Sequence, residues 1–257
     1  MTPDWRLDDQ IAVVTGASGR LGRVWLEALA EAGATAIGVD LREPADDLGF
    51  RVEIADVTDA ESIREAASRI EADAGPVSVL VNNAGIDQPP DAAAETFAIE
   101  DVPLDHFRQT IDVNLVGTFN ATQAFGSRMR DRGRGSIVNI GSLYASRAPD
   151  PGLYDHIEAD PPFLKPAAYG ASKAGVVSLT AYFARLWGSA GVRVNTLSPG
   201  GVAADQDPEF VRKYNARVPL GRMAEPSDLT GPLVFLASGA SRYLTGQNVN
   251  VDGGLTS

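Results

Sequence analysis

The stretch of sequence that decides the fold is Ile11-Ala12-Val13-Val14-Thr15-Gly16-Ala17-Ser18-Gly19-Arg20-Leu21-Gly22. Its first four residues are apolar, as in a short buried strand, and the glycines that follow allow a tight turn into a helix. In such a turn, backbone amides approach a pyrophosphate group at the N-terminus of the helix. Glycine turns that hold no ligand are common. The position of this turn, after a first strand and before a helix, favours a dinucleotide-binding site.

Short apolar runs recur along the whole chain and alternate with helical segments. A parallel sheet that is covered by helices on both faces has this pattern. We therefore predict an α/β fold with a doubly wound sheet of seven parallel strands, forming a single domain over residues 1–257. The strands are expected at residues 11–14, 34–39, 50–55, 77–81, 136–140, 192–197 and 248–251.

The sequence also marks helix ends and loops. Thr58-Asp59-Ala60-Glu61 has the pattern of a capping box, in which the first and last residues bond to each other's backbone at a helix start. The helix after the glycine turn is expected to stop at Gly33. Residues 148–166 and 200–208 are rich in Pro and Asp and are predicted to be loops. In α/β sheets ligands bind beyond the strand ends, so residues that follow the strands are candidate site residues.

The composition restricts the class of protein. The chain has 257 residues, no cysteine, two histidines and a formal net charge of −12. Disulfides and thiolate metal sites are excluded, and no metal site is expected because His106 and His156 lie far apart in the sequence. The negative charge, whose simplest effect is solubility, disfavours nucleic acid and anionic membranes as partners. Residues 1–9 have no apolar signal-peptide core, and no long apolar span follows, so we expect a cytoplasmic protein.

Carboxylates follow two of the predicted strands. Asp40 ends the second strand, where a carboxylate accepts hydrogen bonds from the ribose 2′-hydroxyl of a dinucleotide. This position predicts a preference for NAD over NADP, because the carboxylate would repel a 2′-phosphate. The alternative is a solvated turn aspartate. Asp56 follows the third strand, and its alternative role is to interact with the start of the next helix.

The strongest candidate for catalysis is Tyr169-Gly170-Ala171-Ser172-Lys173, at the start of a predicted helix. Residues four apart share a helix face, so the phenol and the ammonium group are expected to lie close together. A nearby positive charge lowers the pKa of a tyrosine from its usual value of about 10. A Tyr-x-x-x-Lys pair is common by chance, but Ser142 supports it, because a hydroxyl at a strand end can bond a substrate oxygen. Asn114 has the alternative role of a helix-bending polar residue.

These motifs, in this order, resemble the short-chain dehydrogenase/reductase family over nearly the whole chain, from Ile11 to Gly254. The resemblance implies a Rossmann-type fold, bound NAD, and a homo-oligomer of two or four subunits. It implies that Tyr169 exchanges a proton, and that Lys173 lowers the Tyr169 pKa and holds the nicotinamide ribose. Ser142 would position the reacting oxygen, and Asn114 would lie on a proton path, completing a catalytic tetrad. The expected cofactor contacts are Gly16, Ser18, Gly19, Arg20, Leu21, Gly22, Asp40, Leu41, Asp56, Val57, Asn83, Ala84, Gly85, Tyr169, Lys173, Pro199, Gly200 and Val202.

The chain departs from the family pattern in three places. Arg20 stands where most short members have glycine, which gives the glycine spacing of the sugar epimerase and dehydratase branch, and it is expected near the cofactor phosphates or ribose. Ala204 stands where many members place a threonine against the nicotinamide amide, so backbone groups around Val202 are expected to take that role. Ser142 and Tyr169 are 27 positions apart, so the 148–166 loop resembles an insertion.

The sequence therefore predicts an NAD-dependent oxidoreductase that interconverts a secondary alcohol and a ketone. The inserted loop and residues 200–222 resemble a subgroup linked to bacterial sugar and acidic-sugar metabolism, which implies a polyhydroxylated substrate. Within the loop, Tyr154 and His156 are expected to line the substrate site together with Ser142. The alternatives are a sugar epimerase or dehydratase with tightly bound NAD, and a non-catalytic NAD-sensing protein.

Overall fold

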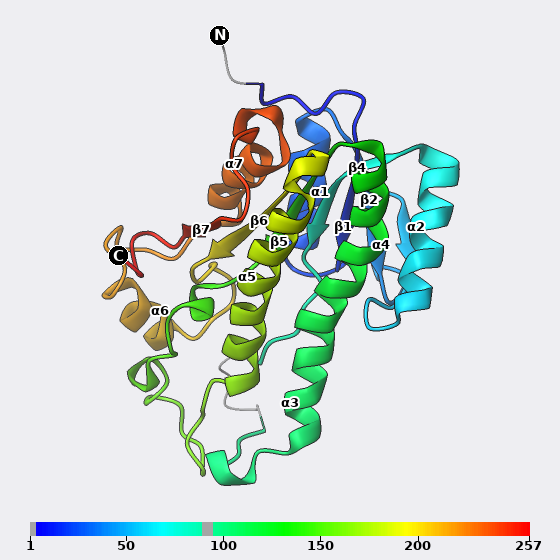
Figure 1. The fold of residues 1–257 in the computed structure, drawn as a ribbon. Helices are drawn as coiled ribbons and strands as arrows, with labels where there is room; N and C mark the ends of the chain where they lie inside the picture. Colours follow the sequence, from blue (N-terminus) through cyan, green and yellow to red (C-terminus); the bar gives the residue numbers. More distant parts are fainter. Residues whose placement is uncertain (1–3, 89–94) are drawn as a thin grey trace.

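Seven strands form one parallel sheet in the order β3-β2-β1-β4-β5-β6-β7 (Figure 1). This computed structural model describes residues 4–88 and 95–257. The predicted α/β class and all seven predicted strands are confirmed. The strands are β1 (Ile11–Thr15), β2 (Thr35–Asp40), β3 (Val52–Ile54), β4 (Val77–Asn82), β5 (Gly135–Ile140), β6 (Val192–Pro199) and β7 (Asn248–Val251).

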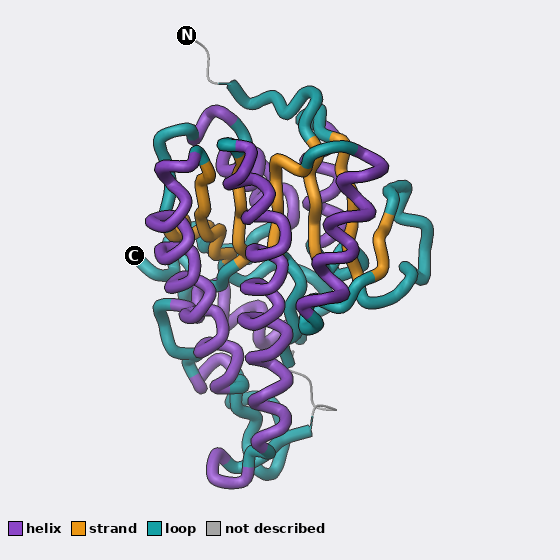
Figure 2. Tube along the Cα trace, turned by 45° about the vertical axis from the view of Figure 1, so that its right-hand side comes forward, coloured by secondary structure: helices purple, strands orange, loops and turns teal. Residues whose placement is uncertain are grey.

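Helices cover both faces of the sheet, and Figure 2 shows one layer of them in front of the strands. Buried side chains of α1 and α7 form one apolar core with the sheet, and those of α2, α4 and α5 form the other. Central strands that are buried on both faces need continuous apolar runs, which is why these strands were readable from the sequence. The helices are α1 (Gly22–Glu31), α2 (Ala60–Ala74), α3 (Leu104–Ile111), α4 (Gly117–Arg132), α5 (Ala167–Trp187), α6 (Pro208–Asn215) and α7 (Pro226–Ala237).

The strand order reverses between β1 and β4, because the chain builds β1, β2 and β3 outward on one side and β4 to β7 on the other. At such a switch point the loops after the two central strands diverge and leave a crevice at their carboxyl ends. The glycine turn follows β1 and Asn83 follows β4, so both border this crevice.

A π-helical turn, Asp112–Val116, joins α3 to α4 and contains Asn114. Such turns interrupt an α-helix locally and often occur at functional sites. The 148–166 segment is largely irregular, as predicted, with one short 3-10 helix at Pro151–Leu153. It packs against α6 through a third apolar cluster. In Figure 1 this loop and α6 lie together below the sheet.

The start of α2 differs from the prediction. Its N-cap is Asp59, whose side chain accepts hydrogen bonds from the backbone N–H groups of Glu61 and Ser62. The expected capping box between Thr58 and Glu61 is therefore wrong by one position. An aspartate caps as well as a threonine does, so the two neighbouring candidates could not be separated from the sequence.

The helix after the glycine turn ends as expected, with Gly33 in a left-handed conformation at φ 107°. Across residues 4–88 and 95–257, no helix has both the length and the apolar character needed to cross a membrane.

Candidate active site

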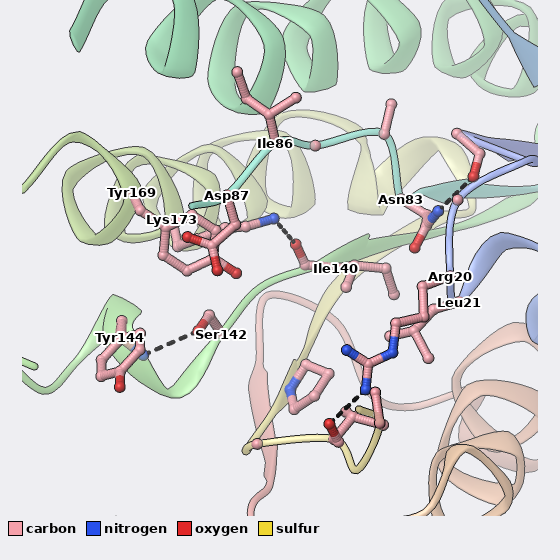
Figure 3. A pocket seen from close by; sticks show the side chains of 18 of the residues that line it. Arg20, Leu21, Asn83, Ile86, Asp87, Ile140, Ser142, Tyr144, Tyr169 and Lys173 are labelled. Carbon is pink, nitrogen blue, oxygen red and sulfur yellow. Dashed lines mark hydrogen bonds between the residues drawn. The ribbon is translucent and has the colours of Figure 1, made fainter. Parts of the chain in front are cut away.

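One cavity of about 1380 Å³ runs along the carboxyl ends of the strands (Figure 3). Pockets for small ligands are typically about 300–1,000 Å³, so this volume suits a dinucleotide together with a substrate. Arg20 and Asn83 lie towards one end of the view in Figure 3, and Asp87, Tyr169 and Lys173 gather at the other.

The glycine turn has the geometry of a cradle for phosphate groups. Gly16 has φ 66°, and a Cβ atom there would lie 2.7 Å from the Cα of Ala84. Gly22 begins α1, and a Cβ atom there would lie 2.2 Å from the carbonyl oxygen of Gly16. Side chains at these positions would close the turn, which leaves backbone N–H groups and the N-terminus of α1 available to an anion. The cradle therefore fits the pyrophosphate of NAD.

Asp40 lies at the end of β2, beside this cradle. Its Oδ2 accepts a hydrogen bond from the Ser18 N–H at 2.8 Å, and its Oδ1 accepts one from the Leu41 N–H at 2.7 Å. A carboxylate has about four acceptor positions, so Asp40 retains capacity for the hydroxyls of a ribose. The backbone bonds fix the carboxylate in the position from which it would contact them.

Arg20 reaches across the cavity and away from its own turn. Its guanidinium donates to the carbonyl oxygens of Val202 at 2.6 Å and Ala203 at 2.8 Å (Figure 3). The side chain therefore ties the glycine turn to the loop after β6, across 182 residues of sequence. This contact was not predicted, because nothing in the sequence pairs these two segments.

The segment after β4 is held by the glycine turn itself. Asn83 donates to the carbonyl oxygens of Thr15 and Gly16 at 3.1 and 2.9 Å, and accepts a bond from the Trp25 indole at 2.8 Å. The Ala84 N–H bonds to the Thr15 hydroxyl at 3.1 Å. Asn83 thus supports the cradle from behind, in addition to lining the cavity.

Ser142, Tyr169 and Lys173 meet at the other end of the cavity, as predicted. The Lys173 ammonium lies 5.8 Å from the centre of the Tyr169 ring and donates to the Ile140 carbonyl at 2.8 Å. Tyr169 and Lys173 come from one face of α5, while Ser142 follows β5. A hydroxyl, a phenol and an ammonium group at one point of the crevice can position a substrate oxygen and exchange a proton with it.

The structure corrects the prediction that the pKa of Tyr169 is lowered. Burial raises the pKa of Tyr169, the Asp87 carboxylate raises it further, and the Ser142 hydroxyl opposes both. Burial also lowers the pKa of Lys173 to about 8. The expected lowering of the Tyr169 pKa by Lys173 does not determine its direction in this structure, because removing both groups from water disfavours the charged form of each.

Asn114 lies behind the cavity and does not line it. Its Oδ1 accepts from the Ile86 N–H at 2.7 Å, and its Nδ2 donates to the Ile86 carbonyl at 3.0 Å and to the Ser172 hydroxyl at 3.1 Å. Both amide hydrogens therefore have partners inside the protein. The side chain holds the segment after β4 against α5, and the proton path through Asn114 stays a prediction.

The 148–166 loop forms one wall of the cavity. Tyr154 is buried at 4% exposure, and its hydroxyl lies 3.0 Å from that of Tyr144. Its ring stacks on Phe210 of α6 with centroids 5.7 Å apart. His156 also lines the cavity, with Nε2 3.0 Å from Asp207. The loop is thus anchored to α6 and presents polar atoms to the space beside Tyr169.

The loop after β6 lines the cavity through Pro199, Gly200 and Val202. The Val202 carbonyl already accepts two bonds, from Arg20 at 2.6 Å and from the Gln206 amide at 2.8 Å. Its two lone pairs are therefore used within the protein. Any contact of this residue with a nicotinamide amide would have to come from its N–H group.

The predicted cofactor residues line the cavity with one exception. Gly22 does not line it, because it is buried beneath the turn that it permits. The structure places the others on the lining, and their contacts with the cofactor stay a prediction: Gly16, Ser18, Gly19, Arg20, Leu21, Asp40, Leu41, Asp56, Val57, Asn83, Ala84, Gly85, Tyr169, Lys173, Pro199, Gly200 and Val202.

Several lining residues were missed by sequence reasoning. Asp87 lies two positions after the Asn83-Ala84-Gly85 segment, and Tyr144 lies two positions after Ser142. Proximity to a strand end was the signal that could have identified both. Phe210, Tyr214 and Met223 carried no such signal, because α6 and the turn after it reach the site by tertiary packing.

Fold and site together define a nucleotide-dependent oxidoreductase, and comparison with known proteins gives the family. A family model described as Enoyl-(Acyl carrier protein) reductase matches residues 16–256. The galactitol 2-dehydrogenase (L-tagatose-forming) of Cereibacter sphaeroides is 40% identical over 266 residues, covering 98% of this chain and 97% of that protein. The chain belongs to the short-chain dehydrogenase/reductase family, as the resemblance of its motifs implied.

Solved structures agree with this assignment. A short-chain dehydrogenase from Leptospira borgpetersenii with bound NAD+ has a TM-score of 0.87 at 34% identity, over 98% of this chain and 94% of that one. A gluconate 5-dehydrogenase from Burkholderia cenocepacia, in complex with NADP and tartrate, has a TM-score of 0.84 at 33% identity, over 98% and 97% of the two chains. The enzyme class is therefore that of an NAD(P)-dependent dehydrogenase/reductase, as predicted.

Proposed function

We propose that this enzyme uses NAD to interconvert a secondary alcohol and a ketone on a polyhydroxylated, sugar-like substrate. The observation that carries the proposal is the meeting of Ser142, Tyr169 and Lys173 at one end of a cavity whose other end is the glycine cradle. The similarity to a galactitol dehydrogenase supports a polyol as the substrate.

Tyr169 is the proposed general acid and base. Because burial raises its pKa, the phenol is protonated at neutral pH and is ready to donate a proton to a carbonyl oxygen. In the direction of oxidation, the phenolate oxygen of Tyr169 takes the hydroxyl proton of the alcohol. Alkaline pH favours this direction, because it favours the phenolate form. Bound NAD would supply the hydride acceptor at the carbinol carbon.

Lys173 is proposed to act on the Tyr169 phenol, and Ser142 is proposed to act on the substrate oxygen. The Lys173 ammonium is fixed by the Ile140 carbonyl and lies near the Tyr169 ring, where it favours the phenolate once a proton has been taken. The Ser142 hydroxyl is proposed to donate to the substrate oxygen and to stabilise the negative charge that develops there. Its orientation is set by the Tyr144 N–H, which bonds to the Ser142 oxygen at 3.2 Å.

The experiment that tests the proposal is a screen of polyols, beginning with galactitol, and of sugars, sugar acids and sugar phosphates with NAD, followed at the absorbance of NADH. NADH that accumulates with one of these substrates, and that is absent with Tyr169→Phe, supports the proposal. If no secondary alcohol yields NADH although NAD binds tightly, the result would contradict the proposal and would favour an NAD-sensing protein.

The epimerase or dehydratase alternative rested on the glycine spacing around Arg20. The matched relative and the two matched structures are dehydrogenases, and each matches this chain over almost its whole length. These matches disfavour the alternative. An epimerase or dehydratase regenerates its NAD, so net formation of NADH distinguishes the two activities.

We also propose a homo-oligomer of two or four subunits in the cytoplasm. Phe119 of α4 and Tyr182 and Leu186 of α5 are exposed by 37%, 60% and 53%, and apolar groups exposed on adjacent helices are typical of a surface between subunits. Sedimentation or light scattering gives the subunit number.

A further inference from the structure

A nearly buried ion pair lies beside the catalytic tyrosine. The Lys165 ammonium is 2.6 Å from Asp87 Oδ2, with the Lys165 side chain 6% exposed and that of Asp87 36% exposed. Asp87 follows β4, and Lys165 ends the 148–166 loop four residues before Tyr169. Both line the cavity. A lysine this far from water needs a partner for its charge, so the two segments are held together at this point.

The ammonium group of Lys165 is already engaged. It donates to Asp87 at 2.6 Å and to the Gln88 carbonyl at 2.9 Å, and it lies 5.3 Å from the centre of the Tyr169 ring. An ammonium has three donors, of which two are hydrogen bonded and the third is beside an aromatic ring. Lys165 is therefore poorly placed to bind a carboxylate of the substrate, and its effect is to fix Asp87.

Asp87, in contrast, has capacity to spare. Its Oδ1 accepts from the Gln88 N–H at 2.8 Å and its Oδ2 accepts from Lys165, so about half of the acceptor positions of the carboxylate are filled. Figure 3 shows the carboxylate next to Tyr169 and Lys173. It raises the pKa of both groups, as a negative charge at close range does. An acceptor therefore stands within the space where a substrate hydroxyl would react.

The charges of the described lining disfavour an acidic substrate. Arg20 donates to the Val202 and Ala203 carbonyls through one of its nitrogens, and Lys173 donates to the Ile140 carbonyl, so each of these cations has a partner within the protein. The carboxylates of Asp87, Glu158, Asp205 and Asp207 face the same space.

We propose that Asp87, held in place by Lys165, accepts a hydrogen bond from the hydroxyl group next to the carbon that is oxidised. The enzyme thereby selects uncharged vicinal diols over sugar acids. This inference rests on the proposed alcohol oxidation and names the chemical class of its substrate.

Three small substrates that share a secondary hydroxyl at C2 test it: 2-pentanol, 1,2-pentanediol and 2-hydroxypentanoate. We expect the wild-type enzyme with NAD to have a kcat/KM for the diol at least about tenfold above that for 2-pentanol, the scale of a hydrogen bond to a charged group. The acid should be the poorest of the three. In Asp87→Asn the ratio of diol to 2-pentanol should fall by about tenfold, and the relative rate with the acid should rise.

Two further variants complete the experiment. Asp87→Ala combined with Lys165→Met removes both members of the ion pair together, so neither is left without the other, and this variant should lose the same preference for the diol. Asp160→Asn removes a charge from an exposed side chain of the same loop that is not among the lining residues, and it should leave the ratio within about twofold of wild type.

An unchanged ratio in both Asp87 variants, or a wild-type preference for the acid, would overturn the inference while the NADH produced upholds the proposed function. Absence of NADH from these three substrates and from every polyol would overturn the proposed function and the inference with it.

Discussion

Replacement of Asp40 by asparagine should change the choice between NAD and NADP. The carboxylate accepts backbone bonds through both oxygens, from Ser18 at 2.8 Å and Leu41 at 2.7 Å. An amide has one oxygen and can keep only one of these bonds. For NAD, the loss of a charged acceptor at the ribose costs about 1.5–3 kcal/mol, which is roughly tenfold to a hundredfold in kcat/KM.

For NADP, the same variant removes a repulsion. Two unit charges about 5 Å apart repel by roughly 1 kcal/mol in water and roughly 3 kcal/mol at an effective dielectric constant of 20. The two effects act in opposite directions on the two cofactors, so the ratio of kcat/KM for NAD to that for NADP should fall by at least about a hundredfold. Arg20 does not offset this, because its guanidinium bonds to the Val202 and Ala203 carbonyls.

The assay is the initial rate of reduction of each cofactor with the best polyol from the screen, at fixed ionic strength. Asp56→Asn is the matched control, since the Asp56 Oδ1 accepts from the N–H and hydroxyl of Thr58 in the same cavity, away from the end of β2. The Asp56→Asn variant should weaken the binding of NAD and of NADP to the same extent. A wild-type enzyme that uses the two cofactors equally, or an Asp40→Asn ratio that matches wild type, would refute the reasoning.

Four other changes have defined outcomes. Tyr169→Phe keeps the ring but removes the proton acceptor, so turnover should fall by at least about a hundredfold with little change in NAD affinity; near-normal turnover would exclude the assigned role. Because burial raises the Tyr169 pKa, the rate of oxidation in wild type should rise with pH above neutrality and the rate of ketone reduction should fall; pH-independent rates of chemistry would contradict this. Arg20→Leu removes the tie between the glycine turn and the Val202 carbonyl and should speed NAD release by about tenfold in stopped-flow measurements, whereas an unaltered release rate would show the tie to be incidental. Tyr154→Phe keeps the stacking on Phe210 and removes the hydroxyl partner of Tyr144, so KM for the polyol should rise while NAD affinity persists; unchanged kinetics would leave the loop as a structural wall only.

The fold was predictable because its strands are short runs, continuously apolar as in β1 or alternating as in β3 and β7, that end in polar or glycine residues. Ser142, Tyr169 and Lys173 were predictable for the same reason, since strand ends and one helix face bring them together. Asn114 shows the limit of this approach. A π-helical turn directs its side chain to the Ile86 backbone, and nothing in the sequence distinguishes that turn from an ordinary helix.

The ion pair between Asp87 and Lys165 could not be predicted from the sequence. They are 78 residues apart, and their pairing depends on how the inserted loop returns to α5. The pKa of Tyr169 was likewise inaccessible, because the spacing to Lys173 reports proximity and does not report how much water each group has lost.

The bridge from Arg20 to the loop after β6 has a thermodynamic consequence. The cavity that it spans is lined by segments from Gly16 to Met223, which come together in the folded chain, so a dinucleotide bound there binds the native state alone. Each tenfold rise in free cofactor above its Kd then adds about 1.4 kcal/mol to the free energy of unfolding. Melting curves recorded with NAD and with NADP would therefore rank the two cofactors before any substrate is known.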